Sequence, residues 1–277
     1  MAQALAAAYV EACDLDVAVL KPGNVSLAAP GHGMSATDFT ASARASAAPL
    51  TAPGAPVGRR ILEAVTATHA AVDCNTNLGI VLTAAPLLAA AERGGALRKA
   101  LASVLAELDG DDATWTYEAI ALASPGGLGR VSEADVHEAP PDTLATAMAL
   151  AAHRDRIARQ YVTDFEDVFE IGVAALDAGL RRFGSEAAAV QWSYLSLLAA
   201  FPDTHIARKF GAARARQVMQ RGREVASRVK ACENPPDFQP LLAAFDRELK
   251  DADANPGTTA DLTVASVLAR RLSRLVE

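Results

Sequence analysis

The chain has 277 residues, of which 51% are apolar, and this is enough to bury a large hydrophobic core and to exclude intrinsic disorder. Its formal net charge of −7 leaves no basic surface broad enough to bind a phosphate backbone, so we expect no nucleic acid among its partners. The three cysteines, Cys13, Cys74 and Cys232, fit neither a disulfide framework nor a Cys-x-x-Cys metal knuckle, which favours a reducing cytoplasm.

The sequence lacks the pattern of a signal peptide or a membrane span. The first residues have no cationic region, and Glu11 and Asp14 interrupt the apolar run that follows. The longest uncharged apolar segments, 77–91 and 187–201, are shorter than the roughly 18 to 20 residues that cross a bilayer. We therefore expect a cytoplasmic protein with no membrane partner, in which these segments form core helices.

The composition predicts an all-α fold, a bundle of about ten or more helices in a single domain of residues 1–277. Alanine and leucine dominate, aromatic residues make up only 5%, and alternating β-branched runs are lacking. Glycine, proline and capping residues mark the helix ends. In chain order we expect helices at 3–16, 35–47 and 57–72, an apolar helix from the loop 73–78 to Gly94, and helices at 97–108, 112–123, 144–160, 162–182, 186–200, 204–230, 238–250 and 259–275.

Polar residues gather at the breaks before helices, where unpaired backbone N–H groups and the helix dipole attract anions. The first break, 21–25, has the sequence Lys-Pro-Gly-Asn-Val. Lys21 and Asn24 suit one phosphate group of a nucleotide, although a solvated turn explains the same residues. His32 and Asp38 follow closely and are candidates for a catalytic base, with an ordinary surface histidine as the alternative for His32.

The second break, 73–79, has the sequence Asp-Cys-Asn-Thr-Asn-Leu-Gly before an apolar helix. An N-cap requires only one polar side chain, whereas this segment offers Asn75, Thr76 and Asn77. We predict that these three side chains contact a nucleotide, with simple helix capping as the alternative. The segment is not a Walker A loop, because that spacing of glycines and lysine is absent from the sequence.

The third break, 202–209, places a carboxylate at a helix start and two cations about one turn later. Asp203 is a candidate magnesium ligand, and Thr204, Arg208 and Lys209 are candidates for phosphate contacts. The alternative is that Asp203 only caps the helix while Arg208 is solvated.

The fourth break, 255–261, repeats this pattern before the last predicted helix, with Thr258 as a cap or phosphate contact and Asp261 in the first turn. Magnesium typically takes one or two protein carboxylates together with substrate phosphates. Asp203 and Asp261 are therefore predicted to act as a pair of metal ligands.

Taken in order, these segments resemble the triphosphoribosyl-dephospho-CoA synthase family. The resemblance covers about 21–268 of the chain, and each motif alone is only moderately specific. The matching features are Lys-Pro-Gly at 21–23, a histidine at His32, Asp-Phe at 38–39, Asn-Thr at 75–76, Asp-Thr before a basic segment at 203–204, and Pro-Gly-x-x-Ala-Asp-Leu at 256–262.

The resemblance implies a helical enzyme that takes ATP as substrate, breaks the bond between adenine and ribose, and transfers the 5-triphosphoribosyl group to a ribose hydroxyl of dephospho-CoA. Magnesium and cations would hold the triphosphate, while the anomeric carbon gains oxocarbenium character and the acceptor hydroxyl loses a proton. The predicted site comprises catalytic Asp38, His32 and Asp203, the metal ligands Asp203 and Asp261, and the nucleotide contacts Lys21, Asn24, Asn75, Thr76, Asn77, Thr204, Arg208, Lys209 and Thr258.

The sequence also departs from the lyase-associated members of that family. Those members carry His-Lys-Gly after the Asn-Thr pair and Arg-Gly-Gly after the Asp-Thr segment, where this chain has Asn-Leu-Gly at 77–79 and Arg-Lys-Phe-Gly at 208–211. Segments 124–130, 155–161 and 203–209 resemble instead a branch found in methane-producing archaea and in bacteria that grow on one-carbon compounds.

We therefore predict an ATP-dependent glycosyltransferase that joins ribose to an acceptor alcohol in the biosynthesis of tetrahydromethanopterin, a one-carbon carrier that contains an α-linked ribose 5-phosphate. Transfer to dephospho-CoA is the first alternative, and a non-catalytic nucleotide-binding or scaffolding homologue is the second. The expected partners are small molecules, a nucleotide and an acceptor alcohol, and the sequence leaves a homodimer open.

Overall fold

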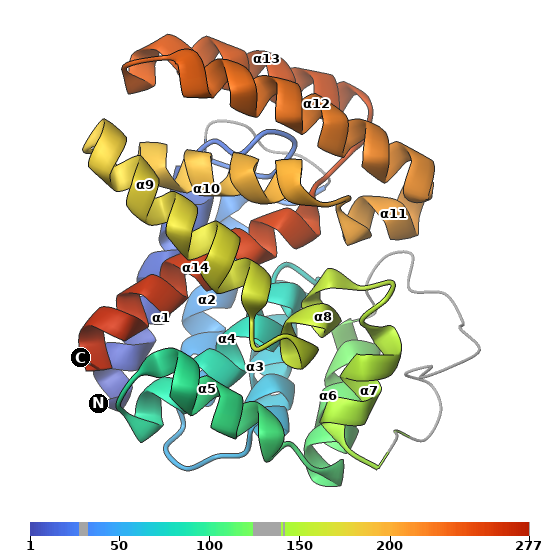
Figure 1. Ribbon diagram of the computed structural model, residues 1–277. Coiled ribbons are helices and arrows are strands. Elements are labelled where there is room, and N and C mark those ends of the chain that lie inside the picture. Colours follow the sequence, from blue (N-terminus) through green and yellow to red (C-terminus); the bar gives the residue numbers. More distant parts are fainter. Residues whose placement is uncertain (28–32, 124–139, 141, 277) are drawn as a thin grey trace.

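The computed structural model describes residues 1–27, 33–123, 140 and 142–276, and within these ranges the regular structure is helical, without a β-strand (Figure 1). The all-α prediction is therefore confirmed. The helices are α1 (Ala2–Ala18), α2 (Ala36–Leu50), α3 (Val57–Val72), α4 (Leu78–Arg93), α5 (Leu97–Ala106), α6 (Gly110–Ala123), α7 (Leu144–Ala151), α8 (Arg156–Val162), the π-helix η1 (Asp167–Val173), α9 (Ala174–Phe183), α10 (Glu186–Ala200), α11 (Thr204–Phe210), α12 (Ala212–Ala231), α13 (Pro235–Asp251) and α14 (Gly257–Val276).

The helices form two groups on either side of α14 (Figure 1). Helices α1 to α8 lie on one side and contribute most of the larger cluster of buried apolar residues. On the other side, α10, α12 and α13 enclose a smaller cluster. Helix α14 contributes Leu262 and Leu268 to the larger cluster and Ala260 to the smaller one. It therefore joins the two cores.

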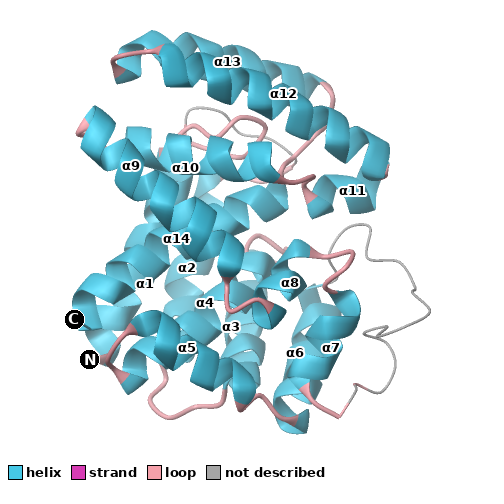
Figure 2. Cartoon of the chain, viewed as in Figure 1, coloured by secondary structure: helices cyan, strands magenta, loops and turns pink. Residues whose placement is uncertain are grey.

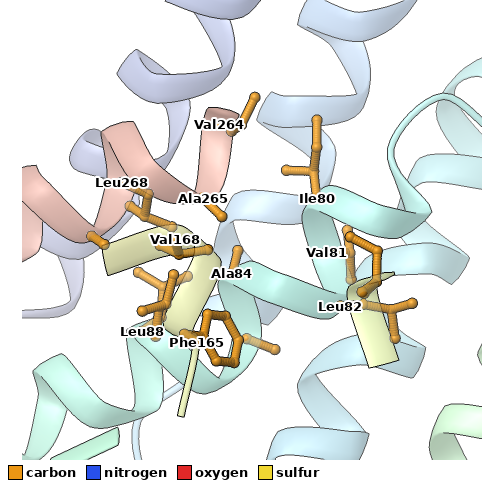
Figure 3. Packing of buried hydrophobic residues seen from close by; sticks show 14 of the residues in the cluster. Ile80, Val81, Leu82, Ala84, Leu88, Phe165, Val168, Val264, Ala265 and Leu268 are labelled. Carbon is orange, nitrogen blue, oxygen red and sulfur yellow. The ribbon is translucent and has the colours of Figure 1, made fainter. Parts of the chain in front are cut away.

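Figure 3 shows part of the larger core, where buried apolar residues of α4, η1 and α14 meet. Val81 and Leu88 of α4 are fully buried, as is Leu268 of α14, in agreement with the prediction that the apolar segment 77–91 forms a core helix. Close packing continues between η1 and α14, because a Cβ at Gly172 would lie 1.9 Å from Ser266 Oγ. The absence of a side chain at Gly172 lets the two backbones approach.

Three of the long predicted helices are broken in the structure (Figure 2). The segment 144–160 divides before Asp155, because the Asp155 carboxylate caps α8 by accepting hydrogen bonds from two backbone N–H groups. The segment 204–230 divides at Gly211, whose φ of 87° lies outside the helical region. In 162–182, positive φ values at Asp164 and Phe165 precede the π-helix.

In the described part of the chain, no single helix is both long and apolar enough to cross a membrane. Helices α4 and α5 satisfy that criterion only when taken together, and their axes are bent by 114°.

Candidate functional site

A cavity of about 1010 Å³ lies among the starts of α4, α8, α11 and α14. Its wall combines apolar side chains with carboxylates, amides and cations that come from distant parts of the sequence. The residues predicted from the sequence that line it are Asn24, Asn75, Thr76, Thr204, Arg208, Lys209, Thr258 and Asp261.

Other predicted site residues do not lie on this wall. Lys21, Asn77 and Asp203 are buried, with exposed fractions of 5% or less. Asp38 is off the wall as well, although its neighbour Phe39 lines the cavity. His32 lies outside the described residues. The prediction of a common cavity surface thus fits only part of the set, and the chemical roles of all these residues stay predictions.

Asp261 is the wall residue with the most unusual surroundings. Its carboxylate packs against Gly79 in the first turn of α4, where a Cβ would lie 2.0 Å from Asp261 Oδ2. No hydrogen bond or ion pair joins this carboxylate to any residue that the structure describes. Burial raises the pKa of Asp261 well above its usual value, and the nearby carboxylates of Asp16 and Asp203 raise it further. Asp261 is therefore a carboxylate whose charge is not balanced by a bonded partner.

A second carboxylate on the wall belongs to Asp16, near the end of α1. Lys21, which is fully buried, lies with its Nζ 3.0 Å from Asp16 Oδ1 and also donates to the Asp16 carbonyl oxygen. Burial raises the pKa of Asp16, and the neighbouring Lys21 ammonium opposes this shift. Lys21, predicted to bind phosphate directly, thus has its ammonium group engaged with Asp16 behind the cavity wall.

The turn 21–24 is fixed by α10 and α13 rather than by solvent. Gly23 has a φ of 82°, and its N–H donates to Asp246 Oδ1 at 2.8 Å. Tyr194 donates to the carbonyl oxygen of Pro22 at 2.6 Å. Asn24 Nδ2 then donates to Asn255 Oδ1 at 2.9 Å, which places both amides on the cavity wall. The alternative of a solvated turn is therefore excluded by these buried contacts.

Two residues of the segment 75–77 line the cavity, and the third is buried beside α2. Asn75 Oδ1 accepts from the Leu78 N–H at 3.2 Å and caps α4, while Thr76 Oγ1 donates to Ser42 Oγ at 2.6 Å. Both residues line the cavity. Asn77 points to Ser46 Oγ, 3.4 Å away, and is buried at the α2 side. Two of the three polar residues thus remain available to a ligand.

Asp203 has no exposed surface, and protein donors occupy both of its oxygens. Oδ1 accepts from the Ile206 N–H at 3.0 Å, and Oδ2 accepts from the N–H and Oγ1 of Thr259, each at 2.8 Å. Burial raises the pKa of Asp203, and these hydrogen bonds oppose the shift. Asp203 joins the start of α11 to the start of α14, which is the capping arrangement considered as the alternative to a metal ligand.

Asp38 is likewise occupied as part of a capping box at the start of α2. Its Oδ2 accepts from both the N–H and the Oγ of Ser35, each at 2.8 Å. These hydrogen bonds lower the pKa of Asp38. A lowered pKa weakens a carboxylate as a proton acceptor near neutral pH, so the local chemistry does not favour Asp38 as a general base.

The starts of α8, α11 and α14 are connected by hydroxyl groups. Thr204 Oγ1 lies 3.0 Å from Thr258 Oγ1 and accepts from the Arg156 N–H at 3.2 Å. Arg208 Nη1 reaches Asp155 Oδ2 at 3.3 Å, and Lys209 Nζ pairs with Asp253 at 2.8 Å on the exposed rim. This side of the cavity therefore carries the cations that sequence reasoning placed at the α11 start.

Sequence reasoning missed Arg156, which also lines the cavity. Its Nε and Nη2 each donate to one oxygen of Asp167 at 2.7 Å, and its guanidinium lies 4.1 Å from the centre of the Phe201 ring. It also missed Asp16, Asp155 and Asn255. Asp155 shows a recognisable signal, since aspartate is a favoured N-cap residue, whereas the role of Asp16 depends on contacts distant in the sequence.

The chain is similar to other proteins over most of its length. The family described as ATP:dephospho-CoA triphosphoribosyl transferase (CitG) matches residues 2–277. A crystal structure from Archaeoglobus fulgidus, described as that of a candidate triphosphoribosyl-dephospho-CoA synthase, is similar with a TM-score of 0.64 and 26% sequence identity. The similarity covers 83% of this chain and 97% of that one. A comparison with curated proteins found no match.

The family match extends over nearly the whole chain and includes every element that lines the cavity. The structural similarity supports the same helical scaffold. Nucleotide-dependent group transfer is therefore the chemistry of the family whose match includes this cavity. This chain belongs to the ATP:dephospho-CoA triphosphoribosyl transferase family.

Proposed function

We propose that this protein transfers the 5-triphosphoribosyl group of ATP to a ribose hydroxyl of dephospho-CoA. The acceptor oxygen forms a bond to C1′ of the ATP ribose as the bond between C1′ and adenine breaks. The hydroxyl proton leaves to a base, and adenine departs with a proton on its ring nitrogen. Family membership supports this chemistry. The finding that carries it to this chain is the carboxylate of Asp261, which has no bonded partner among the described residues and lies in a cavity that also holds Arg156 and Arg208.

The cations and hydroxyls at the α11 and α14 starts suit the triphosphate. Arg208 presents a guanidinium to this cavity, with Nη1 3.3 Å from Asp155 Oδ2 and Nη2 3.4 Å from His205 Nδ1, and a guanidinium can bind a phosphate through two hydrogen bonds. Thr204 and Thr258 lie beside it, and Lys209 stands at the rim. Asn24, Asn75 and Thr76 provide amide and hydroxyl groups on other parts of the same wall.

Magnesium fits this cavity through Asp261 and Asp16 rather than through Asp203. Asp203 has both oxygens occupied by protein donors, whereas Asp261 has none and Asp16 lines the same cavity. Two carboxylates are enough for magnesium when a triphosphate supplies further oxygen ligands. When bound, the ion neutralises triphosphate charge and relieves the mutual repulsion of the two carboxylates. The Lys21 ammonium, which does not line the cavity, stabilises the Asp16 carboxylate through their ion pair.

The wall offers His153 and His205 as proton acceptors for the acceptor hydroxyl, and Nδ1 of His205 lies 3.4 Å from Arg208 Nη2. Asp38 is less suitable, because Ser35 occupies its Oδ2 and lowers its pKa. We therefore assign proton removal to one of the wall histidines. Single replacement of each by Asn, with the pH dependence of turnover as the measurement, distinguishes them: the base is the residue whose loss removes the acidic limb of the profile.

The cavity also suits an acceptor with a long uncharged arm. Its volume of about 1010 Å³ is at the upper end of the roughly 300–1,000 Å³ that a single ligand pocket usually has. Beyond the polar part, its wall is apolar, with Leu82, Ile120, Met148 and Ile157 from four different helices. Dephospho-CoA combines a nucleotide with such an arm. This property favours dephospho-CoA over the tetrahydromethanopterin pathway that the branch motifs suggested.

The direct test is incubation with ATP, magnesium and dephospho-CoA, followed by quantification of free adenine and mass determination of the product. We expect adenine release that depends on the acceptor, and a product heavier than dephospho-CoA by one triphosphoribosyl group. Parallel reactions contain ADP or a ribitol-linked pterin as acceptor. Adenine release with the pterin alone would replace dephospho-CoA by the one-carbon acceptor, and no release with any acceptor would favour a non-catalytic nucleotide-binding protein.

Arg208→Ala measures the phosphate contact separately. Loss of a charge-assisted bond should weaken ATP binding by about 1.5–3 kcal/mol, while affinity for dephospho-CoA changes less. Arg93→Ala is the control, because Arg93 is exposed, pairs with Glu107 and does not line the cavity. The homodimer and the cytoplasmic location are further parts of this proposal, and light scattering of the purified protein tests the first.

A further inference from the structure

The guanidinium of Arg156 is held in one orientation on the cavity wall. Asp167 accepts its Nε and Nη2 donors in a bidentate pair, with both distances 2.7 Å. The ring of Phe201 lies against one of its faces, 4.1 Å from the guanidinium carbon. Gln160 Nε2 also donates to Asp167 and so fixes the carboxylate itself. The plane of the guanidinium is therefore set by three neighbours before any ligand arrives.

This arrangement leaves a specific part of Arg156 available. The side chain is 24% exposed and lines the cavity, and Nη1 has no hydrogen bond among the described residues. Phe201 lies against one face and Asp167 occupies one edge, so neither of them takes up the opposite face or Nη1. That surface is flat, and its shape matches an aromatic ring more closely than a tetrahedral phosphate.

Charge leads to the same conclusion. The bidentate pair with Asp167, which is 3% exposed, balances the positive charge of Arg156. A guanidinium paired in this way attracts a phosphate less than an unpaired guanidinium does. It keeps its ability to stack on a π system, since that depends on the planar surface and on dispersion.

We propose that Arg156 is a specificity-determining residue, the platform on which the purine ring of a nucleotide substrate stacks, with Nη1 placed to donate to a ring nitrogen. This inference rests on the proposed function, because that function supplies the nucleotides. Both ATP and dephospho-CoA contain adenine, so the shared chemistry is the purine base, and the experiment separates the two sources. Asp167 and Phe201 act through Arg156 as positioning residues.

The test is calorimetric titration of wild type and Arg156→Lys with ATP, inorganic tripolyphosphate and dephospho-CoA, with magnesium throughout. Lysine retains a cation for Asp167 but removes the planar face and Nη1. If the stacked purine is that of ATP, the preference for ATP over tripolyphosphate should fall roughly five- to tenfold, in line with the usual strength of base stacking. If the stacked purine is that of dephospho-CoA, the affinity for dephospho-CoA should fall by the same factor, and the preference for ATP over tripolyphosphate should be unchanged.

Arg98 provides a matched control, because it lies over Phe169 at 5.3 Å and pairs with Glu170 but does not line the cavity. Arg98→Lys should leave all three affinities unchanged. Should Arg156→Lys fail to fold, Phe201→Leu removes the supporting ring and should give the same selective loss. Equal weakening of ATP and tripolyphosphate would place Arg156 on the phosphates and overturn the proposal, as would unchanged affinities for all three ligands. These titrations need no turnover, so selective base binding without adenine release would refute the proposed function alone.

Discussion

Two aspartates close to the start of α14, Asp203 and Asp261, are in opposite situations. Asp203 is fully enclosed, and donors from Ile206 and Thr259 occupy both of its oxygens. Asp261 packs against Gly79 on the cavity wall, and no described residue donates to it. In both, burial raises the pKa, but only at Asp203 do several hydrogen bonds oppose the shift. The difference indicates that Asp203 connects helices, whereas Asp261 has free capacity for a ligand.

The strongest way to test this contrast is Asp261→Asn. The substitution preserves shape and removes the charge that we assign to magnesium and the triphosphate. We expect turnover, measured as adenine release, to fall at least about 100-fold, as is common when a charged transition-state contact is lost. Retention of wild-type turnover at limiting magnesium would show that Asp261 has no part in catalysis.

Gly79→Ala tests the same carboxylate without altering it. The new Cβ would lie 2.0 Å from Asp261 Oδ2, so the carboxylate or α4 must shift. We expect a loss of turnover of roughly tenfold or more, since misplacement by about 1 Å can cost two orders of magnitude. Gly222→Ala is the control, because the atoms nearest to its Cβ would be two of the Leu198 side chain, at 3.1 and 3.3 Å, and the Leu198 carbonyl oxygen at 3.6 Å. Equal activity of both variants would contradict the packing argument.

Lys21→Met tests the buried ion pair between Lys21 and Asp16. It leaves the buried Asp16 carboxylate without its cation, and breaking such a pair typically destabilises a protein by about 3–5 kcal/mol. Urea denaturation should show this loss. The double variant Lys21→Met/Asp16→Asn should recover part of the stability but not the activity. If instead Lys21→Met is as stable as wild type and binds ATP weakly, the original prediction of a direct phosphate contact is right.

Asp203→Asn should act mainly on stability. An amide in place of Oδ2 or Oδ1 leaves at least one backbone N–H without an acceptor, which costs about 1–3 kcal/mol. The magnesium concentration that gives half-maximal turnover should be unchanged in the folded variant. A large increase in that concentration with unaltered stability would support Asp203 as a metal ligand, as the sequence predicted.

The smallest effect concerns pH. A carboxyl whose pKa is raised in the folded state contributes stability when protonated, and this contribution is lost as pH rises through the folded-state pKa. Asp261 has such a raised pKa. Asp261→Asn should therefore melt at a slightly higher temperature than wild type near pH 7, and the gap should narrow as pH falls towards the ordinary aspartate value of 3.8. A difference in melting temperature that does not change with pH would mean that the ionisation of Asp261 does not affect stability.

The helical fold and the positions where polar residues precede helices could be predicted from the sequence, because capping and apolar periodicity are local. The breaks at Asp155 and Gly211 were missed, since helix propensity alone continues through them. In the sequence, Asp203 and Asp261 each follow a break before a predicted helix, but Asp203 is the N-cap of α11, whereas α14 begins at Gly257 and Asp261 lies beyond its first turn. Whether a carboxylate meets donors or a glycine depends on which helix packs against it, and Gly79 lies 182 positions away from Asp261.

The position of α14 also affects how the protein is made. A ribosome releases α1 to α13 before α14, which covers parts of α1, α4 and α10 and brings Asp261 to Gly79. During that interval these helices expose apolar faces, a condition under which nascent chains aggregate or recruit chaperones. Until α14 is present, the growing polypeptide therefore lacks both the helix that joins its two cores and the Asp261 side of its cavity.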